Sequence, residues 1–340
     1  MLRLAGPAGG WRIMMRLVPA PPRRGEIALV AFGVLASLLV GEAAVRLVSA
    51  RPGPGGYAPV NTGGRDRGPT NSLGYRDREH TLARRPGVRR LVCLGDSFTW
   101  GVGVLFDDTW PPRLERLLAA RRGEEWEAVS LAERGLNAVQ QASHLESEGL
   151  TYEPDVVVLA WVLNDSEDTD AAEARRAEDW LGESRQPPSA PRRLLDHSAL
   201  FRLVRTRVRA TIENRRRVEG YRSMYAPDYP GWQAAQQALR AMGGMCRARG
   251  VPLVIAIFPL FGNPLDERYP FGELHEKVAM AAAAGGAHVV DLLPRYRGLR
   301  WDLLAVDGAN DEHPNEIAHR IAAQALVRTI DEVAPRAPGP

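Results

Sequence analysis

The sequence predicts an α/β protein with three layers, in which helices cover both faces of a parallel, doubly wound sheet of five strands. Two observations favour this fold class. Short, continuously apolar segments alternate along the chain with longer segments whose apolar residues recur at helical spacing. Polar and apolar residues do not alternate in these segments, as they would in a strand with one face in solvent. We therefore expect both faces of each strand to be buried. Strands joined by helical crossovers of this kind form a flavodoxin-like sheet.

The elements follow one another regularly after residue 88. The strand at 156–162 is apolar without a break, and it is therefore expected at the centre of the sheet. The first long helix has Pro111 and Pro112 at its start and apolar residues on one face, as expected of a helix packed on a sheet. The expected strands are residues 89–94, 126–131, 156–162, 253–258 and 288–292, and the expected helices are residues 110–121, 138–148, 232–249, 271–284 and 314–333.

The composition is that of an ordinary globular protein. Of the 340 residues, 45% are hydrophobic and 25% are charged, and the formal net charge of +3 is too small to indicate nucleic-acid binding. The sequence has no glycine-rich phosphate loop and no zinc-finger spacing. Two cysteines are too few for a disulfide framework or a cysteine-rich metal site. We therefore expect no nucleic-acid partner, no metal and no organic cofactor.

The first 50 residues are predicted to meet a membrane. Residues 1–24 contain five arginines and no acid, and the apolar part of the next segment, Ile27 to Val48, is interrupted only by Glu42 and Arg46. The segment at 25–50 is long enough to span a bilayer, because those two charges lie near one end. A cleaved signal peptide is the alternative. The arginines predict that residues 1–24 stay in the cytoplasm, which makes the remainder extracytoplasmic, in the periplasm, on a single-pass anchor.

Three further regions complete the domain organisation. Residues 51–87 are rich in Gly, Pro and Arg and are predicted to be a linker. The folded domain is predicted at residues 88–334, with a tail at 335–340. Within it, an insertion at 166–229 lacks clear strands and contains an apolar stripe beside a basic one, formed by Phe201, Val204, Val208 and Ile212 and by Arg202, Arg205, Arg209 and Arg216. Such a helix lies on anionic lipid, holds an anionic substrate, or covers the sheet as an exposed lid.

Four polar motifs stand where strand ends are expected to meet. Ser97 follows the first strand, Gly135 the second and Asn164 the third, while His313 precedes the last helix. In open α/β sheets, catalytic and binding residues gather outside the carboxyl ends of the strands. We therefore expect these four residues to lie close together.

These residue types suit nucleophilic catalysis. A serine hydroxyl becomes an effective nucleophile when a base accepts its proton, and histidine suits that role near neutral pH. The histidine in turn requires an acceptor on its other ring nitrogen. The negatively charged tetrahedral intermediate requires hydrogen-bond donors, and the N–H groups of Ser97 and Gly135 and the side-chain amide of Asn164 are candidates.

Over residues 71–333 the motifs resemble the SGNH (GDSL-type) hydrolase family, whose four blocks match in order at Ser97, Gly135, Asn164 and His313. The resemblance implies a serine ester hydrolase in which Ser97 is the nucleophile and His313 the base. It also implies that Ser97, Gly135 and Asn164 form the oxyanion hole. Expected substrates are esters of small molecules, lipids or glycans, cleaved through an acyl-enzyme. The order of anchor, linker and catalytic domain is similar to that of membrane-anchored bacterial members.

The chain departs from the family pattern in two places. Val162 replaces a glycine in the third block, and Asn310 stands where the family has the triad aspartate, three residues before His313. Asp311 is the nearest carboxylate and is our candidate for the triad, with Asp307 as the alternative. Two other functions stay open: acyl transfer to a cell-envelope glycan by the same serine, and a non-catalytic envelope protein, which Asn310 suggests.

Overall fold

The computed structural model describes residues 24–49, 68–170, 197–307 and 311–334. Contacts divide the chain into two units. One comprises Met1–Gly53 with Pro187–Val208, and the other comprises Pro54–Gln186 with Arg209–Pro340.

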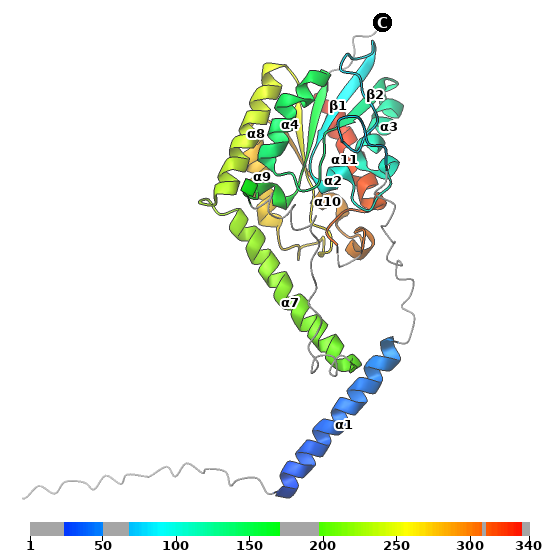
Figure 1. Cartoon of the computed structure of the whole chain (residues 1–340), viewed down its shortest axis with the longest axis vertical. Helices are drawn as coiled ribbons and strands as arrows, with labels where there is room; N and C mark the ends of the chain where they lie inside the picture. The colour runs from blue at the N-terminus through cyan, green and yellow to red at the C-terminus, as the bar shows by residue number, and fades with distance from the viewer. Residues whose placement is uncertain (1–23, 50–67, 171–196, 308–310, 335–340) are drawn as a thin grey trace, which may run out of the picture. The chain divides into compact units, whose positions relative to one another are not determined.

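The larger unit contains a sheet of five parallel strands in the order β2-β1-β3-β4-β5 (Figure 1). The third strand in sequence lies at the centre of the sheet and is buried along its whole length. Both the predicted parallel sheet and its central strand are confirmed, and the strand ends differ from the expected ones by one residue. The strands are β1 Val88–Leu94, β2 Glu125–Ser130, β3 Val156–Trp161, β4 Leu253–Ile257 and β5 His288–Asp291.

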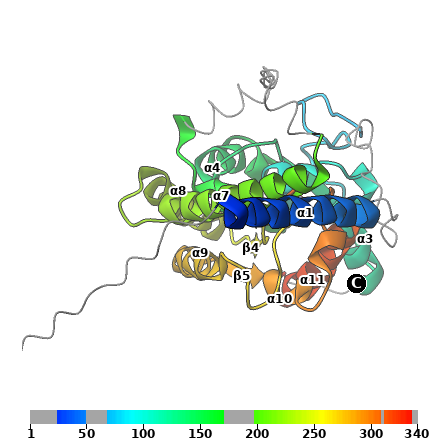
Figure 2. The same cartoon turned by 90° about the horizontal axis from the view of Figure 1, so that it is seen from below.

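Helices cover both faces of this sheet, as a three-layer α/β/α fold requires. On one face α3 packs against α11, and on the other α4 packs against α8, while α9 lies beside β5 (Figure 2). The long helices of this unit are α3 Trp110–Arg122, α4 Ala138–Ser147, α8 Pro230–Ala248, α9 Gly272–Ala284 and α11 Glu316–Val333. Short helices connect them: α2 Ser97–Trp100, η1 Phe106–Asp108, η2 Gly149–Tyr152, η3 Leu163–Ser166, α10 Leu293–Tyr296 and η4 Trp301–Leu303.

The core contains a buried charge that the apolar pattern of β1 does not predict. Arg90 is 1% exposed, and its guanidinium donates to the Glu127 carboxylate and to the backbone carbonyls of Thr81, Leu82 and Tyr152. A buried cation is tolerated only with such partners, so this side chain fixes the start of the sheet to the chain that precedes it. Cys93 and Cys246 are both buried and free.

Part of the segment predicted as a linker packs on the sheet unit. Arg76 is buried, and its guanidinium donates to the carbonyls of Trp100, Gly101 and Val104 at 2.7, 2.8 and 2.6 Å. The adjacent Asp77 accepts from the backbone N–H of Ser130 at 2.7 Å. These contacts tie Arg76 to the end of α2 and the loop that follows it, and Asp77 to the end of β2.

The smaller unit contains α1 Arg24–Ser49 and the beginning of α7 Ala199–Met224. The side chains of α1 are largely exposed, and the helix is long and apolar enough over Arg24–Leu47 to cross a membrane. Its composition fits either a membrane anchor or a signal sequence.

Candidate active site

Ser97 lies at the point where the chain leaves β1 and begins α2. The turn needs glycine at position 95, because its φ of +149° is open to glycine and an added Cβ would overlap the side chain of Thr99. Asp96 then caps α2, with Oδ1 accepting from the backbone N–H of Phe98 at 3.0 Å. The result is a serine side chain that is partly exposed at the carboxyl edge of the sheet.

The structure brings Ser97, His313 and Asp311 into one line of hydrogen bonds. The distance between Ser97 Oγ and His313 Nε2 is 2.9 Å, and the distance between His313 Nδ1 and Asp311 Oδ1 is 2.7 Å. The backbone N–H of His313 also donates to Asp311 Oδ1 at 2.7 Å. A carboxylate two residues before the histidine therefore contacts the imidazole, and Asp307 is not needed for this contact. Asn310 lies outside the described residues.

The backbone around His313 is fixed on both sides. The N–H of Val306 donates to the His313 carbonyl at 3.1 Å, and Ala305 forms a β-bridge with Pro314. Asn315 caps α11 by accepting from the first N–H groups of that helix, and its amide donates to the Leu303 carbonyl at 2.8 Å. These bonds hold the imidazole at the edge of the sheet where β1 ends.

The charges at the site keep the imidazole basic. Burial lowers the pKa of His313, but the hydrogen bond and the negative charge of Asp311 outweigh it, so the pKa is raised above its usual value. Burial acts to raise the pKa of Asp311, and its bond to His313 overcomes this and lowers the pKa. By contrast, burial lowers the pKa of His319 to about 3, and its Nδ1 accepts from the N–H of Trp110 at 3.1 Å. His319 is therefore a neutral core residue.

Asn164 lies on the other side of Ser97. Its Nδ2 donates to Asp96 Oδ2 at 2.9 Å, and within the part of the chain that the structure describes the second hydrogen of this amide remains for another acceptor. The turn of η3 that carries Asn164 is fixed by the buried Asp165, which accepts from the N–H of Val162 and from the amide of Gln141, both at 2.8 Å. The Val162 that replaces the family's glycine is fully buried.

Gly135 lies in the turn after β2, with a φ of 75°. Because β2 pairs with β1 up to Cys93 and Ser130, this turn starts at the same edge of the sheet as Ser97. The structure thus brings Ser97, His313 and Asp311 into direct contact and joins Asn164 to them through Asp96. Gly135 is placed at the same edge, without a hydrogen bond to the other four among the described residues.

One contact at the site is not predicted by the sequence. Glu312 stands between Asp311 and His313, and its carboxylate is paired with Arg217 of α7 and accepts from the hydroxyl of Tyr221 at 3.3 Å. Burial raises the pKa of Glu312, and the charge of Arg217 opposes that shift. Nearly a hundred residues separate the partners in the sequence, so no spacing signals this contact.

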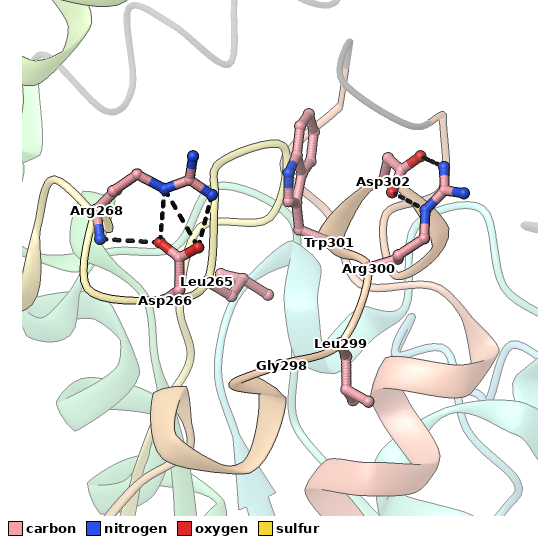
Figure 3. A pocket seen from close by; sticks show the side chains of 8 residues that line it. All are labelled: Leu265, Asp266, Arg268, Gly298, Leu299, Arg300, Trp301 and Asp302. Atoms are coloured by element: carbon pink, nitrogen blue, oxygen red, sulfur yellow. Dashed lines mark hydrogen bonds and ion pairs between the residues drawn. The ribbon is translucent and has the colours of Figure 1, made fainter.

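A pocket of about 300 Å³ lies among the loops that follow β4 and β5 (Figure 3). Trp301 stands between two ion pairs in this view, one joining Arg268 to Asp266 and the other joining Arg300 to Asp302. Neither Asp96 nor His313, the residues whose side chains are bonded to Ser97 Oγ, lines this pocket. Among the described residues, no group of three His, Cys, Asp or Glu side chains is arranged to hold a metal ion.

Comparisons with solved structures found several chains with low sequence identity to this one. Solved structures with similarity to the chain include TesA, with 16% identity, a TM-score of 0.45, and coverage of 72% of this chain and 99% of that one. They also include an acetylxylan esterase from Geobacillus stearothermophilus, with 15% identity, a TM-score of 0.45, and coverage of 74% and 97%. A lipase/acylhydrolase from Enterococcus faecalis has 15% identity, a TM-score of 0.42, and coverage of 73% and 100%. No curated protein sequence matches the chain.

The family assignment rests on the sequence match. The pattern of the GDSL-like lipase/acylhydrolase family matches residues 93–321, which is well over half of the chain and includes Ser97, Gly135, Asn164 and His313. The resemblance noted from the four motifs is thereby confirmed. The chain belongs to the GDSL-like lipase/acylhydrolase family, and it is a hydrolase that acts on ester bonds.

Proposed function

We propose that the chain hydrolyses carboxylic esters through an acyl-enzyme formed on Ser97. The observation that carries the proposal is the 2.9 Å separation of Ser97 Oγ and His313 Nε2, backed by the 2.7 Å separation of His313 Nδ1 and Asp311 Oδ1. Serine, imidazole and carboxylate in this order are the arrangement that activates a hydroxyl for attack on a carbonyl carbon.

The first half of the reaction forms the acyl-enzyme. His313 Nε2 accepts the proton of Ser97 as Oγ bonds to the ester carbon, and Asp311 stabilises the resulting imidazolium. The oxyanion accepts hydrogen bonds from the backbone N–H groups of Ser97 and Gly135 and from the free amide hydrogen of Asn164. The tetrahedral intermediate then collapses. The bond between the carbon and the alcohol oxygen breaks, and His313 returns its proton to the leaving alcohol.

The second half repeats these roles with water. His313 accepts a proton from water as the water oxygen bonds to the acyl carbon, and collapse of the second intermediate releases the acid and returns the proton to Ser97 Oγ. No step requires a metal or an organic cofactor. The family membership favours water over a sugar hydroxyl as the acceptor of the acyl group.

The contact between Asp311 and His313 removes the main reason for considering a non-catalytic protein. That alternative arose from Asn310, which cannot stabilise an imidazolium as a carboxylate does. Asp311 offers the missing carboxylate from the neighbouring position.

We further propose that the reaction takes place outside the cytoplasmic membrane. The apolar helix α1 and the five arginines before its apolar part support a single-pass anchor whose amino end stays in the cytoplasm. Esters of lipids and of envelope glycans are the substrates that this location would offer, besides small esters.

Replacement of Ser97 by Ala tests the mechanism. Turnover of a short-chain aryl ester should fall by roughly 10³-fold or more, because the nucleophile is lost. A fluorophosphonate probe should label the natural chain and fail to label the Ser97→Ala variant. Ser147→Ala is a matched control, since Ser147 is an exposed serine on α4 whose hydroxyl bonds only within its own helix. Unchanged turnover in Ser97→Ala, or equal labelling of both chains, would refute the proposal.

A further inference from the structure

A carboxylate of α1 caps the amino end of α7. Glu42 accepts hydrogen bonds from the hydroxyl of Ser198 at 2.8 Å and from the backbone N–H groups of Ala199 and Leu200 at 2.9 Å each. These N–H groups have no partner inside their own helix, because they belong to its first turn. Arg46 completes the contact by donating to Glu42 Oε1 at 2.7 Å and to the carbonyl of His197 at 3.0 Å.

This contact lies close to one end of the apolar part of α1. The segment that is apolar enough to cross a membrane ends at Leu47, so Glu42 lies about 8 Å from that end at 1.5 Å per residue. A carboxylate at such a depth is costly unless it finds donors, and the first turn of α7 provides them. Gly41 permits the close approach, since a Cβ at this position would lie 3.2 Å from Leu200 Cδ2.

The helix that begins there exposes apolar side chains to solvent. Val204 and Val208 are 52% and 53% exposed, and Ile212 continues their line one turn further along α7. Spaced four residues apart, the three share one face of the helix. The sequence has four arginines between residues 202 and 209, so this half of the helix is strongly basic. A helix with one apolar face and one basic face suits the boundary between water and lipid.

We propose that the first half of α7 lies in the headgroup layer of the membrane that α1 crosses, with Val204 and Val208 inserted toward the acyl chains. Two arguments select lipid as the occupant of this face. The capping contact starts α7 at the level of the bilayer boundary, directly beside the exposed apolar surface of α1. The positive charge that the sequence gives to residues 202–209 favours a surface of anionic headgroups. The inference rests on the proposed role of α1 as a membrane anchor.

Depth-dependent quenching in vesicles tests this placement with the full chain. An environment-sensitive fluorophore is attached at Val208→Cys, at Leu35→Cys in the middle of α1 as a membrane standard, and at Met280→Cys on α9 as a water-exposed standard. The natural cysteines are buried and are left in place. The vesicles contain phosphatidylglycerol and phosphatidylcholine, with nitroxide placed near the headgroup in one set and near the end of the acyl chain, where it can quench position 35, in another. With the headgroup nitroxide, quenching at position 208 should exceed that at position 280 by roughly twofold or more.

The three positions separate the possible outcomes. If position 35 is quenched and position 208 behaves like position 280, α1 is an anchor but the placement of α7 is refuted. If position 35 is not quenched either, the proposed anchor itself fails. Quenching at position 208 could also vary with the number of chains per vesicle. That result would assign the apolar face to a second copy of the chain and would refute the proposal.

A charge reversal adds an independent readout. Val204→Glu should reduce quenching at position 208, because a carboxylate among the acyl chains is unfavourable and is repelled by anionic lipid. Met280→Glu introduces the same charge on an exposed apolar residue of α9 and should leave quenching at position 208 unchanged. An equal effect of both substitutions would contradict the proposed contact.

Discussion

Asp311 contacts the proposed catalytic histidine from an unusual position in the chain. Its Oδ1 accepts from both the backbone N–H and the ring Nδ1 of His313, two residues further on. The first of these bonds is an Asx-turn, a local fold that aspartate and asparagine form readily. The turn brings the carboxylate against the ring of its own neighbour. We propose that a spacing of two residues serves here the purpose of the spacing of three that is usual in the family.

Replacement of Asp311 by Asn should preserve the turn and remove the charge. We expect kcat/KM to fall by roughly 10²–10⁴-fold, since an amide does not stabilise the imidazolium. The natural chain should gain activity as pH rises through a pKa above the usual histidine value of 6.5, because His313 must be neutral to accept a proton. In Asp311→Asn this acid limb should move to lower pH, since the carboxylate that raises the pKa is gone. The pH profile of kcat/KM measures both effects.

Asp307→Asn is the matched control for this experiment. Asp307 was the alternative triad residue, and its replacement should leave the acid limb where it is. A shift caused by Asp307→Asn, with none caused by Asp311→Asn, would reverse the assignment of the two carboxylates.

Replacement of Asn164 by Ala should lower kcat more than it changes KM. If the amide donates to the oxyanion, the loss in kcat is expected to be roughly 10²–10³-fold, because the interaction forms fully only as negative charge develops. The measurement is steady-state kinetics with a short aryl ester, accompanied by thermal unfolding to check that the loss of the bond to Asp96 leaves the fold intact. A change in KM alone would show that Asn164 binds substrate without stabilising the intermediate.

At the level of elements, α7 contacts the loop that carries the proposed base. Arg217 is paired with Glu312 and also donates to Asn263 Oδ1 at 3.0 Å, while Tyr221 bonds to the same carboxylate. The carboxylate of Glu312 is mostly buried, so it requires this cation to remain charged. We therefore infer that α7 positions the loop of residues 311–313, and that Arg217 acts through Glu312 on the orientation of His313.

Replacement of Arg217 by Ala should lower kcat by roughly 10-fold with little effect on KM, because small displacements of a catalytic group slow the reaction. The pH profile should change as well, since Glu312 would become easier to protonate once the opposing cation is lost. Steady-state kinetics across pH measures both effects, and Arg217→Lys should recover part of the loss.

Arg222→Ala is a control on the same helix. Its guanidinium pairs with Glu273, and both partners of that pair are about half exposed. Exposed pairs contribute little, so this variant should behave like the natural chain. If both arginine variants lose activity equally, the effect would come from α7 in general and the positioning role of Arg217 would be wrong.

At the level of the whole molecule, the chain joins an ester hydrolase to an apolar helix that fits a membrane. The hydrolase unit has its own sheet and its own apolar core. None of the described residues of α1 belongs to that core. Leu29, Phe32, Leu39 and Val40 are all more than 60% exposed on α1, a pattern that water does not favour and lipid does.

A double substitution of Leu35 and Leu38 by Arg should prevent anchoring. Each arginine near the centre of a spanning helix costs about 2.5–3.5 kcal/mol on insertion, so the pair makes insertion unfavourable. The natural chain should remain with membranes after alkaline extraction, and the double variant should not. Leu47→Arg, at the end of the apolar segment, should be retained, because a long side chain can reach the interface from there. Retention of the double variant would contradict the anchor.

The sequence alone determined the class of fold and most of the elements. Continuous apolar runs marked the five strands, and helical periodicity marked the helices between them, because both signals are carried by residues that are neighbours in the chain. The third strand, unbroken in its apolar character, is the central one in the structure. The four motifs, taken in order, resembled the blocks of the family, and the family match over residues 93–321 confirms that resemblance.

Only the tertiary structure decided which side chains meet at that edge. The choice of Asp311 over Asp307 depends on the turn that brings its carboxylate to His313. The pairing of Arg217 with Glu312 joins residues far apart in sequence, and no local pattern specifies it. The same holds for the buried network of Arg90 and for the contact of Glu42 with the first turn of α7. The hydrophobic patterns that predict strands and helices involve residues close together in the sequence. The partners of these charged side chains come from distant segments, and they meet only when the crossovers and loops pack together.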